Sequence, residues 1–436
     1  MILRLLLLLL VILEVCSLRI LYVVTSSSGT NKDGSDRFNS TIIPVLQTSI
    51  QSMLSSNNYS VDLYLILSYE LSDDRENNIR SVLPKSVGLE VWNDATPFYI
   101  SEVKDKRRIR QIPKTLARQH RFVIKDKLFE YDFFVAMEDD MLVQGEQLQY
   151  HLRLSDKIKR LRAEAPYNTD ILVPPGVKPA DIFHGNLTKR QVSRLWPGFV
   201  RVEILQEGSD SQEVPDEIPV DLNGLSLNAS VCCRMLDKPN PSNESLMIWE
   251  TGVAGLSVRE IPGLGWVALL QGPTYFPGTK DRIAGYYPYA DFNLTRKPIA
   301  IPQSKYMAQT GGWMATRQQL LELHLDLCQG SFFPPYDDPY FWNDGLWGHN
   351  SGVESWSGGI QMWTQQSGCN MQRVLLLEDF SAALLYHTAN NKQRTIKEHR
   401  RVLARNLLGQ LNSLMKAAER AKNEQTRAPK DGKTNF

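Results

Sequence analysis

Three adjacent acids are the residues of this chain best suited to do chemistry. Glu138, Asp139 and Asp140 end the apolar run from Phe133 to Met137, which is typical of a buried, parallel strand. Open α/β sheets bind ligands at the carboxyl ends of such strands. Three neighbouring carboxylates repel one another unless a cation neutralises them, and Mg²⁺ or Mn²⁺ is commonly held by carboxylates and phosphate oxygens. The alternative is an acidic turn that caps a helix from Met141 onward.

A glycine pair forms the second candidate. Gly311 and Gly312 precede Trp313 and a helical stretch from Arg317 to Leu325. Paired glycines let a backbone approach a ligand closely, and an indole can stack on the apolar face of a sugar. The plainer interpretation is a glycine turn before a helix that Thr316 caps.

A late histidine and lysine form the third candidate. His387 and Lys392 follow the apolar residues Leu384 and Leu385. A neutral imidazole is a good ligand for Mn²⁺, and a lysine can hold a phosphate as a point charge. The alternative is a histidine that caps or hydrogen-bonds at a helix end.

Taken together, these features resemble the glycosyltransferases of the GT-A fold. In that family the acidic triplet, called the DxD motif, holds the metal that bridges the two phosphates of a nucleotide-sugar. The resemblance implies Mn²⁺ or Mg²⁺ bound by the triplet with a late histidine as a further ligand, and a glycine loop that lines the donor sugar. The residues concerned are Glu138, Asp139, Asp140 and His387 for the metal, and Gly311 and Gly312 for the donor. Trp313 and Lys392 join the donor candidates on the chemistry of their side chains.

The resemblance also implies a catalytic base. In inverting members of the family a carboxylate after the glycine loop deprotonates the acceptor hydroxyl. Glu354 is the first candidate, because Ser355 to Gln366 can continue from it as a helix, as in the family's xED element. Asp344 is the second, and neither residue sits in a Glu-Asp pair. Trp347 and Trp356 lie nearby in sequence and are candidates for sugar contacts.

Strand and helix patterns alternate in the first third of the chain. Strands are expected at 19–25, 61–67 and 133–137, and helices at 41–55 and 112–129. Such alternation favours a parallel sheet. We therefore expect an α/β fold, with a GT-A-like, mostly parallel sheet flanked by helices in a single large domain with insertions. Arg118, Arg121 and Lys125 on the last helix would face either a diphosphate or solvent.

The expected domain spans residues 18–395. Its parts are a nucleotide-binding half (18–150), a variable acceptor region (151–300), and a segment with the glycine loop, the acid and the histidine (301–395). A basic helix from Thr395 to Ala421 and a disordered tail would occupy 396–436. The chain of 436 residues has a net charge of +1 and no long basic run, which gives no reason to invoke nucleic acid.

The amino terminus indicates the secretory pathway. Arg4 precedes the uncharged run Leu5 to Leu13, which has the length of a signal-peptide core and is too short to span a bilayer. Cleavage after Ser17 is expected, and a retained signal anchor in the membrane is the alternative. Sequons for glycosylation in the lumen of the Golgi or ER lie at Asn39, Asn58, Asn186, Asn228, Asn243 and Asn293.

Four cysteines remain beyond that segment and allow up to two disulfides. Adjacent Cys232 and Cys233 seldom bridge each other, so Cys328 with Cys369 is the first pair to test. The sequence thus predicts a luminal, metal-dependent enzyme that transfers a sugar from a nucleoside-diphosphate donor to a hydroxyl of a glycan or glycoconjugate. A secreted glycoside hydrolase and a non-catalytic carbohydrate-binding protein are the alternatives.

Overall fold

The computed structural model describes part of the chain. The described residues are 17–30, 34–56, 59–95, 116, 119–165, 189–204, 246–248, 256–270, 311–328, 332–333, 369, 371–388 and 402–403, with Asn412, Met415, Lys416 and Glu419. The candidates Glu354, Asp344, Lys392, Trp347 and Trp356 lie outside them, as do the residues before Ser17. In this described part, no helix is both apolar enough and long enough to cross a membrane.

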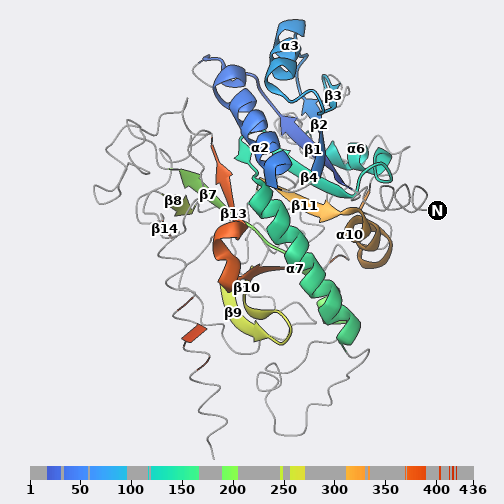
Figure 1. Cartoon of the computed structure of the whole chain (residues 1–436), viewed down its shortest axis with the longest axis vertical. Helices are drawn as coiled ribbons and strands as arrows, with labels where there is room; N and C mark the ends of the chain where they lie inside the picture. Colours follow the sequence, from blue (N-terminus) through green and yellow to red (C-terminus); the bar gives the residue numbers. More distant parts are fainter. Residues whose placement is uncertain are drawn as a thin grey trace, which may run out of the picture.

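A five-stranded, mostly parallel sheet forms the centre of the fold (Figure 1). Its order is β11-β4-β1-β2-β3, with β1 at Leu18–Ser26, β2 at Tyr59–Leu67, β3 at Leu89–Trp92, β4 at Phe133–Glu138 and β11 at Gly312–Thr316. The pairs of β1 with β2, β1 with β4 and β2 with β3 are parallel, and β11 runs antiparallel to β4. The predicted α/β class is confirmed.

The sheet is covered on both faces, which explains its nearly continuous apolar strands. In β1, Ile20 and Tyr22 pack into one buried cluster while Leu21 and Val23 pack into another, as the two-residue alternation of a strand requires. The first face carries α2 (Ile43–Ser56) and α7 (Gly145–Glu164). The second carries α6 (His120–Asp126) and α10 (Arg317–Glu322). Figure 1 shows α2 and α7 on the same side of the strands.

Two smaller sheets adjoin α7. One has the order β6-β12-β10-β9, and the other has the order β14-β8-β7-β13-β5. Their strands are β5 (Met141–Leu142), β6 (Leu195–Pro197), β7 (Val200–Ile204), β8 (Leu246–Ile248), β9 (Leu256–Ile261), β10 (Gly265–Leu270), β12 (Gln372–Leu376), β13 (Leu384–His387) and β14 (Val402–Leu403). The pairing of β13 with β5 matters most, because it brings residues near 387 beside the end of β4.

The shorter helical segments connect these strands. They are η1 (Phe38–Ile42) and α3 (Asp73–Val82) in the first third, α9 (Lys189–Val192) before β6, η6 (Leu323–Leu327) after α10 and η8 (Leu377–Ala383) between β12 and β13. The predicted helix over 41–55 is therefore η1 followed by α2. The predicted helix from Arg317 is α10 and η6, and Thr316 does cap it, through a hydrogen bond from Gln319 N to its hydroxyl.

Three expectations differ from the structure. The chain after the triplet first forms β5, and α7 begins only at Gly145, so the acids do not cap a helix at Met141. Strand β14 stands where part of the C-terminal helix was expected, because Val402 and Leu403 pair with β8. Arg121 is fully buried and donates to the carbonyl of Phe332 at 2.9 Å, so it faces neither solvent nor a diphosphate.

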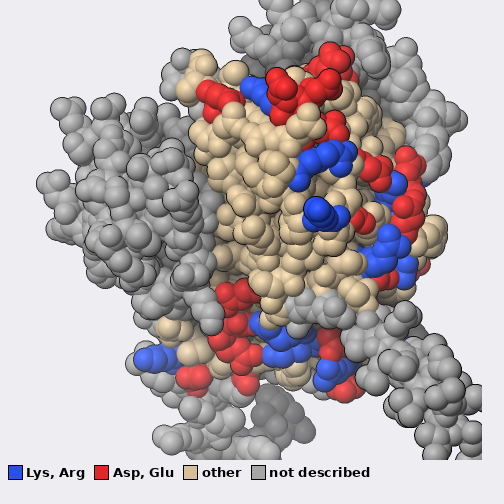
Figure 2. Space-filling view, turned by 45° about the horizontal axis from the view of Figure 1, so that its top comes forward, with Lys and Arg blue, Asp and Glu red and all other residues tan. Residues whose placement is uncertain are grey.

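The described surface mixes charges of both signs. Figure 2 shows acidic and basic side chains next to one another on the face that it views. The described surface also includes ion pairs, such as Arg80 with Glu76 on α3 and Lys127 with Glu90 at the edge of β3. Exposed pairs of this kind contribute at most about 1 kcal/mol each, so the fold depends chiefly on its two buried clusters.

A disulfide joins Cys328 to Cys369, as the sequence predicted. It closes a loop of 41 residues between the end of η6 and the approach to β12. The loop-entropy relation gives about 4 kcal/mol for a loop of this length.

We expect Cys328→Ser with Cys369→Ser to lower the free energy of unfolding by that order in urea denaturation. Reductant should destabilise the parent and leave the double variant unchanged; equal stability of the two proteins would contradict this account.

A buried histidine on α7 should make stability depend on pH. His151 is fully buried, its Nε2 lies 3.0 Å from Gln319 Oε1, and its ring stacks on Phe199. Burial lowers the pKa of His151 to about 4, against about 6.5 in an unfolded chain. The unfolded state therefore binds more protons between these values, so stability is complete above pH 6.5 and falls as the pH drops toward 4.

We expect this histidine to account for about 3 kcal/mol of that acid loss. His151→Phe should flatten the pH dependence of the urea midpoint between pH 6.5 and 4. Gln319 Oε1 keeps its hydrogen bond from Thr316 N in that variant. His324→Gln, at a less buried histidine whose pKa burial also lowers, is the comparison variant and should flatten the slope less than His151→Phe does. An unchanged slope in His151→Phe would show that other groups titrate.

Candidate functional site

Segments far apart in sequence meet at the carboxyl edge of the central sheet. Strands β1 and β4 are parallel and end there together, with Thr25 opposite Glu138. Strand β11 is antiparallel, so its first residue Gly312 lies opposite Met137. Strand β13 pairs with β5 such that His387 lies opposite Met141. The acidic triplet, the glycine pair and the late histidine are therefore neighbours.

The glycine pair makes this close approach possible. Gly311 has φ of 70°, and Gly312 has φ of 155°. A Cβ on Gly311 would lie 2.4 Å from Met141 Cγ, and one on Gly312 would lie 2.0 Å from the carbonyl oxygen of Ala136. The carbonyl of Gly311 accepts from Glu138 N at 2.7 Å. The glycines thus hold β11 against the triplet, and a contact with a donor sugar stays a prediction.

Trp313 does not have the role that its sequence context suggested. It is buried at 3% exposure, its indole Nε1 donates to His120 Nε2 at 3.1 Å, and its ring meets Phe332 edge-on. An indole enclosed in this way cannot stack on a sugar. Trp313 is a core residue of the face that carries α6 and α10, and the stacking interpretation is wrong.

Arg37 neutralises part of the triplet, and no local pattern in the sequence marks it. Its guanidinium binds both carboxylate oxygens of Asp139, with Nη2 to Oδ1 at 2.5 Å, and reaches Asp140 Oδ2 at 3.2 Å. It also donates to the carbonyl of Ser28 at 3.2 Å. Arg37 therefore fixes the loop after β1 to the end of β4, and Asp139 is committed to a protein cation.

Asp140 faces the histidine. Its Oδ2 lies 3.1 Å from His387 Nε2, and both side chains are largely buried. Thr388 holds the backbone of Asp140 through two bonds to its carbonyl, from N at 2.8 Å and from Oγ1 at 3.1 Å. Asp140 Oδ1 is buried and accepts no hydrogen bond from the described part of the protein. This oxygen has the capacity to bind a further partner.

Glu138 meets a second buried arginine. Arg201 belongs to β7, and its Nη1 lies 3.8 Å from Glu138 Oε2. The side chain of Arg201 is only 1% exposed. Glu138 is the most accessible acid of the three, with 28% of its side chain exposed. Arg201 was not anticipated either, because an arginine in an alternating strand reads as a solvent-facing residue.

The surrounding charges determine the ionisation of the acids. Burial raises the pKa of Asp140, but His387, Arg37 and Arg201 outweigh it and hold the pKa well below its ordinary value. Burial also raises the pKa of Asp139, and the bidentate guanidinium of Arg37 opposes that rise. Burial lowers the pKa of Arg37, but the carboxylates of Asp139 and Asp140 raise it by more, so its pKa is above the ordinary value. The charge on Asp139 thus depends on this arginine.

The donor atoms can be compared with what a hard cation requires. Among the described residues, no three His, Cys, Asp or Glu side chains are grouped so as to hold a metal. Asp140 and His387 provide two, and Mg²⁺ typically takes only one or two carboxylates and completes its octahedron with water and phosphate. Neighbouring ligands of an ion at about 2.1 Å lie about 3 Å apart, which matches the 3.1 Å between Asp140 Oδ2 and His387 Nε2. The same 3.1 Å is also the length of a direct hydrogen-bonded pair, so a metal ion at Asp140 and His387 stays a prediction.

Comparisons with known proteins add little to this geometry. No family model matches the chain, and no curated protein matches it. One similar solved structure is the mannosyltransferase Ktr4p from S. cerevisiae in complex with GDP, with 12% identity and a TM-score of 0.22. The match covers 32% of this chain and only 38% of that one. A likeness of this size bears on neither the function nor the site.

The bond between Arg37 and Asp139 should be important for stability. Removing one partner of a buried ion pair leaves an uncompensated charge and costs about 3 kcal/mol or more, so we expect Arg37→Ala to lower the free energy of unfolding by that order. Arg80→Ala removes a pair with Glu76 whose side chains are 51% and 35% exposed, and should cost less than about 1 kcal/mol. Urea denaturation compares them, and equal losses would refute the structural role of Arg37.

Proposed function

We propose that this chain is a metal-dependent glycosyltransferase that moves a sugar from a nucleoside-diphosphate donor to a hydroxyl of a glycan or glycoconjugate. The observation that supports it best is the buried, unsatisfied Oδ1 of Asp140 beside His387 at the carboxyl edge of the sheet. The resemblance of the triplet, glycine pair and late histidine to GT-A enzymes gives that edge its interpretation.

Residues at this edge divide the work between them. Asp140 and His387 would hold Mn²⁺ or Mg²⁺, and Glu138 is accessible enough to join them directly or through water. Asp139 is assigned to Arg37 and so to the architecture of the site. The buried guanidinium of Arg201 offsets the charge of Glu138. Gly311 has no side chain to clash with Met141, so its carbonyl can accept from Glu138 N and hold the triplet in place.

The chemistry is electrostatic in this proposal. A divalent cation, when bound, stabilises the negative charge that develops on the leaving diphosphate. The acids of the chain would hold the cation in position. Burial strengthens each electrostatic interaction at the site because water is excluded. A carboxylate must still take the acceptor proton; Glu354 is the first candidate and Asp344 the second. Lys392 is the candidate phosphate contact.

Asp140 and Asp139 should respond differently to the same substitution. Asp140→Asn should weaken Mn²⁺-dependent nucleotide binding at least about 100-fold, since altering a group behind a metal ligand already costs roughly 10- to 100-fold. Asp139→Asn should keep that binding within about threefold and lose stability instead, because its partner is Arg37. Calorimetry of nucleoside diphosphate with and without Mn²⁺ measures the first effect, and urea denaturation the second.

His387→Ala provides an independent check and should weaken Mn²⁺ binding as Asp140→Asn does. If Asp140→Asn and His387→Ala both bind Mn²⁺ and nucleotide like the parent, the metal assignment is wrong. If Asp139→Asn is the variant that loses the metal, the division of work between the two aspartates is reversed.

Donor dependence separates the classes of function. We expect sugar transfer, or slow hydrolysis of a nucleotide-sugar to free nucleoside diphosphate, that stops when a chelator is added. Glu354→Gln should reduce it by about 100-fold or more, the upper part of the range for general-base catalysis. Activity in Glu354→Gln together with its loss in Asp344→Asn would move the base to Asp344. Cleavage of oligosaccharide in chelator without nucleotide would indicate a glycoside hydrolase instead.

A further inference from the structure

A cavity of about 460 Å³ lies at the opposite end of the central sheet from the acidic triplet. Its lining includes Asp132, just before β4, and Thr316, the last residue of β11. The six residues of β4 separate this end from Glu138, a distance of about 20 Å. The cavity is thus distinct from the candidate active site, and its volume is within the usual range for small-molecule pockets.

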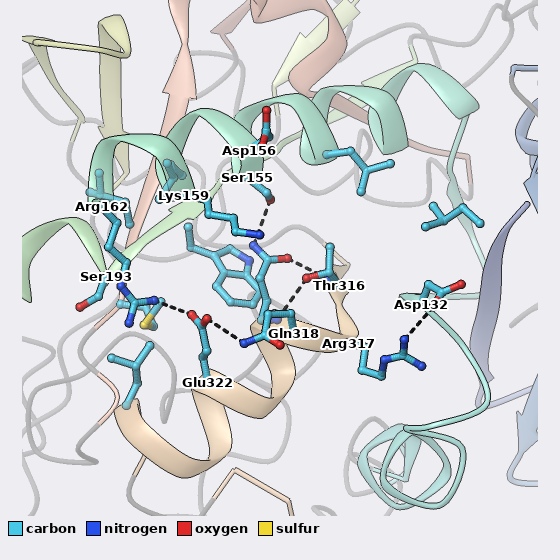
Figure 3. Close-up of a pocket in the computed structure, with 18 residues that line it drawn as sticks. Asp132, Ser155, Asp156, Lys159, Arg162, Ser193, Thr316, Arg317, Gln318 and Glu322 are labelled. Atoms are coloured by element: carbon cyan, nitrogen blue, oxygen red, sulfur yellow. Dashed lines mark hydrogen bonds and ion pairs between the residues drawn. The ribbon is translucent and has the colours of Figure 1, made fainter. Parts of the chain in front are cut away.

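Figure 3 shows how the walls are formed. Lys159 and Arg162 project from α7 on one side, and Gln318 and Glu322 project from α10 on the other. Apolar side chains from α7, β6 and the segments around them line the cavity further, namely Leu152, Ile158, Leu195, Trp196, Leu327 and Met371. The cavity therefore offers mainly apolar surface between two helices.

The polar groups of the wall bond largely to one another. Gln319 accepts from Thr316 N at 2.8 Å and donates to Ser155 Oγ at 3.0 Å. Gln318 donates to Glu322 at 3.0 Å, and Arg162 pairs with the other oxygen of Glu322 at 2.6 Å. A ligand would find few vacant hydrogen-bonding groups here, which argues against a sugar or another densely polar molecule.

Charges in the wall are paired in the same way, with one exception. Arg317 pairs with Asp132, and Asp156 pairs with Arg160. Lys159 is exposed, lines the cavity and forms no ion pair within the described parts of the chain. Lys157, two residues earlier on α7, is already paired with Glu378 at 2.7 Å. Within the described residues, Lys159 thus places at the mouth of the cavity an ammonium that no carboxylate pairs with.

We propose that this cavity binds a single-chain amphiphile with one anionic head group, a carboxylate or a phosphate monoester. Its apolar body lies between α7 and α10 against Trp196, and its head pairs with Lys159. Leu18, the first residue of β1, also lines the cavity, so the apolar run Leu5 to Leu13 precedes the site by only four residues. If that run is kept in a membrane, its end lies within about 18 Å of Leu18, so amphiphiles of the bilayer are close to the cavity.

Calorimetry with the full chain tests this site, with dodecyl phosphate and dodecanoate below their micelle concentrations as probes. Saturable binding with one site per chain is expected for at least one of them, and the stronger probe identifies the head group. Lys159→Ala should weaken it about five- to tenfold, as expected for one charged hydrogen bond near the surface. Lys157→Ala is the matched control and should bind as the parent does. Ser193→Trp, which fills the cavity, should abolish binding.

The proposal fails if dodecanol or dodecyltrimethylammonium binds as tightly as the anionic probes, because the head group would then have no role. It also fails if Lys159→Ala and Lys157→Ala bind alike, or if Ser193→Trp keeps its thermal midpoint and still binds. Nucleotide binding at the acidic triplet is measured separately and should be unchanged in all three variants, so loss of the proposed transferase activity would not affect this test.

Discussion

Three carboxylates and three basic side chains occupy one small region at the end of β4, and their mutual neutralisation is the constraint on which the site depends. Two charges 4 Å apart interact by about 4 kcal/mol near a protein surface, so a triplet this buried would not remain ionised alone. Arg37 binds Asp139, Arg201 lies behind Glu138, and His387 faces Asp140. Each acid therefore has its own basic partner, and His387 is a counter-charge only while it is protonated.

These counter-charges come from three different parts of the chain. Arg37 lies in the loop after β1, Arg201 in β7 and His387 at the end of β13. None is close in sequence to the triplet, so the acids are balanced only when the central sheet and the β5-β13-β7 sheet have both formed. The electrostatics of the site and the assembly of the two sheets are consequently one requirement. A change that disrupts either sheet should therefore alter the charge balance around Asp140.

The features predicted correctly from the sequence are those that follow from local residue patterns and from where a strand ends. Strands β1, β2 and β4 have apolar runs, and the position of Glu138 at a carboxyl edge follows from them. The pair of Cys328 and Cys369 followed from the few cysteines available. Arg37 and Arg201 could not be found, because nothing local marks an arginine that is buried by a distant strand. Trp313 was misassigned for the same reason, since its partner His120 lies 193 residues away.

The balance of charge also bears on why a triplet would be kept where one acid would be simpler. With His387 neutral, three carboxylates face two guanidiniums, and one negative charge is left over. On the proposed function, a divalent cation at Asp140 and His387 turns that remainder into one net positive charge, which attracts a diphosphate. With only Asp140 present, two arginines and a dication would crowd the site with positive charge and oppose metal binding. The acids committed to Arg37 and Arg201 are therefore what lets Asp140 act on the cation alone.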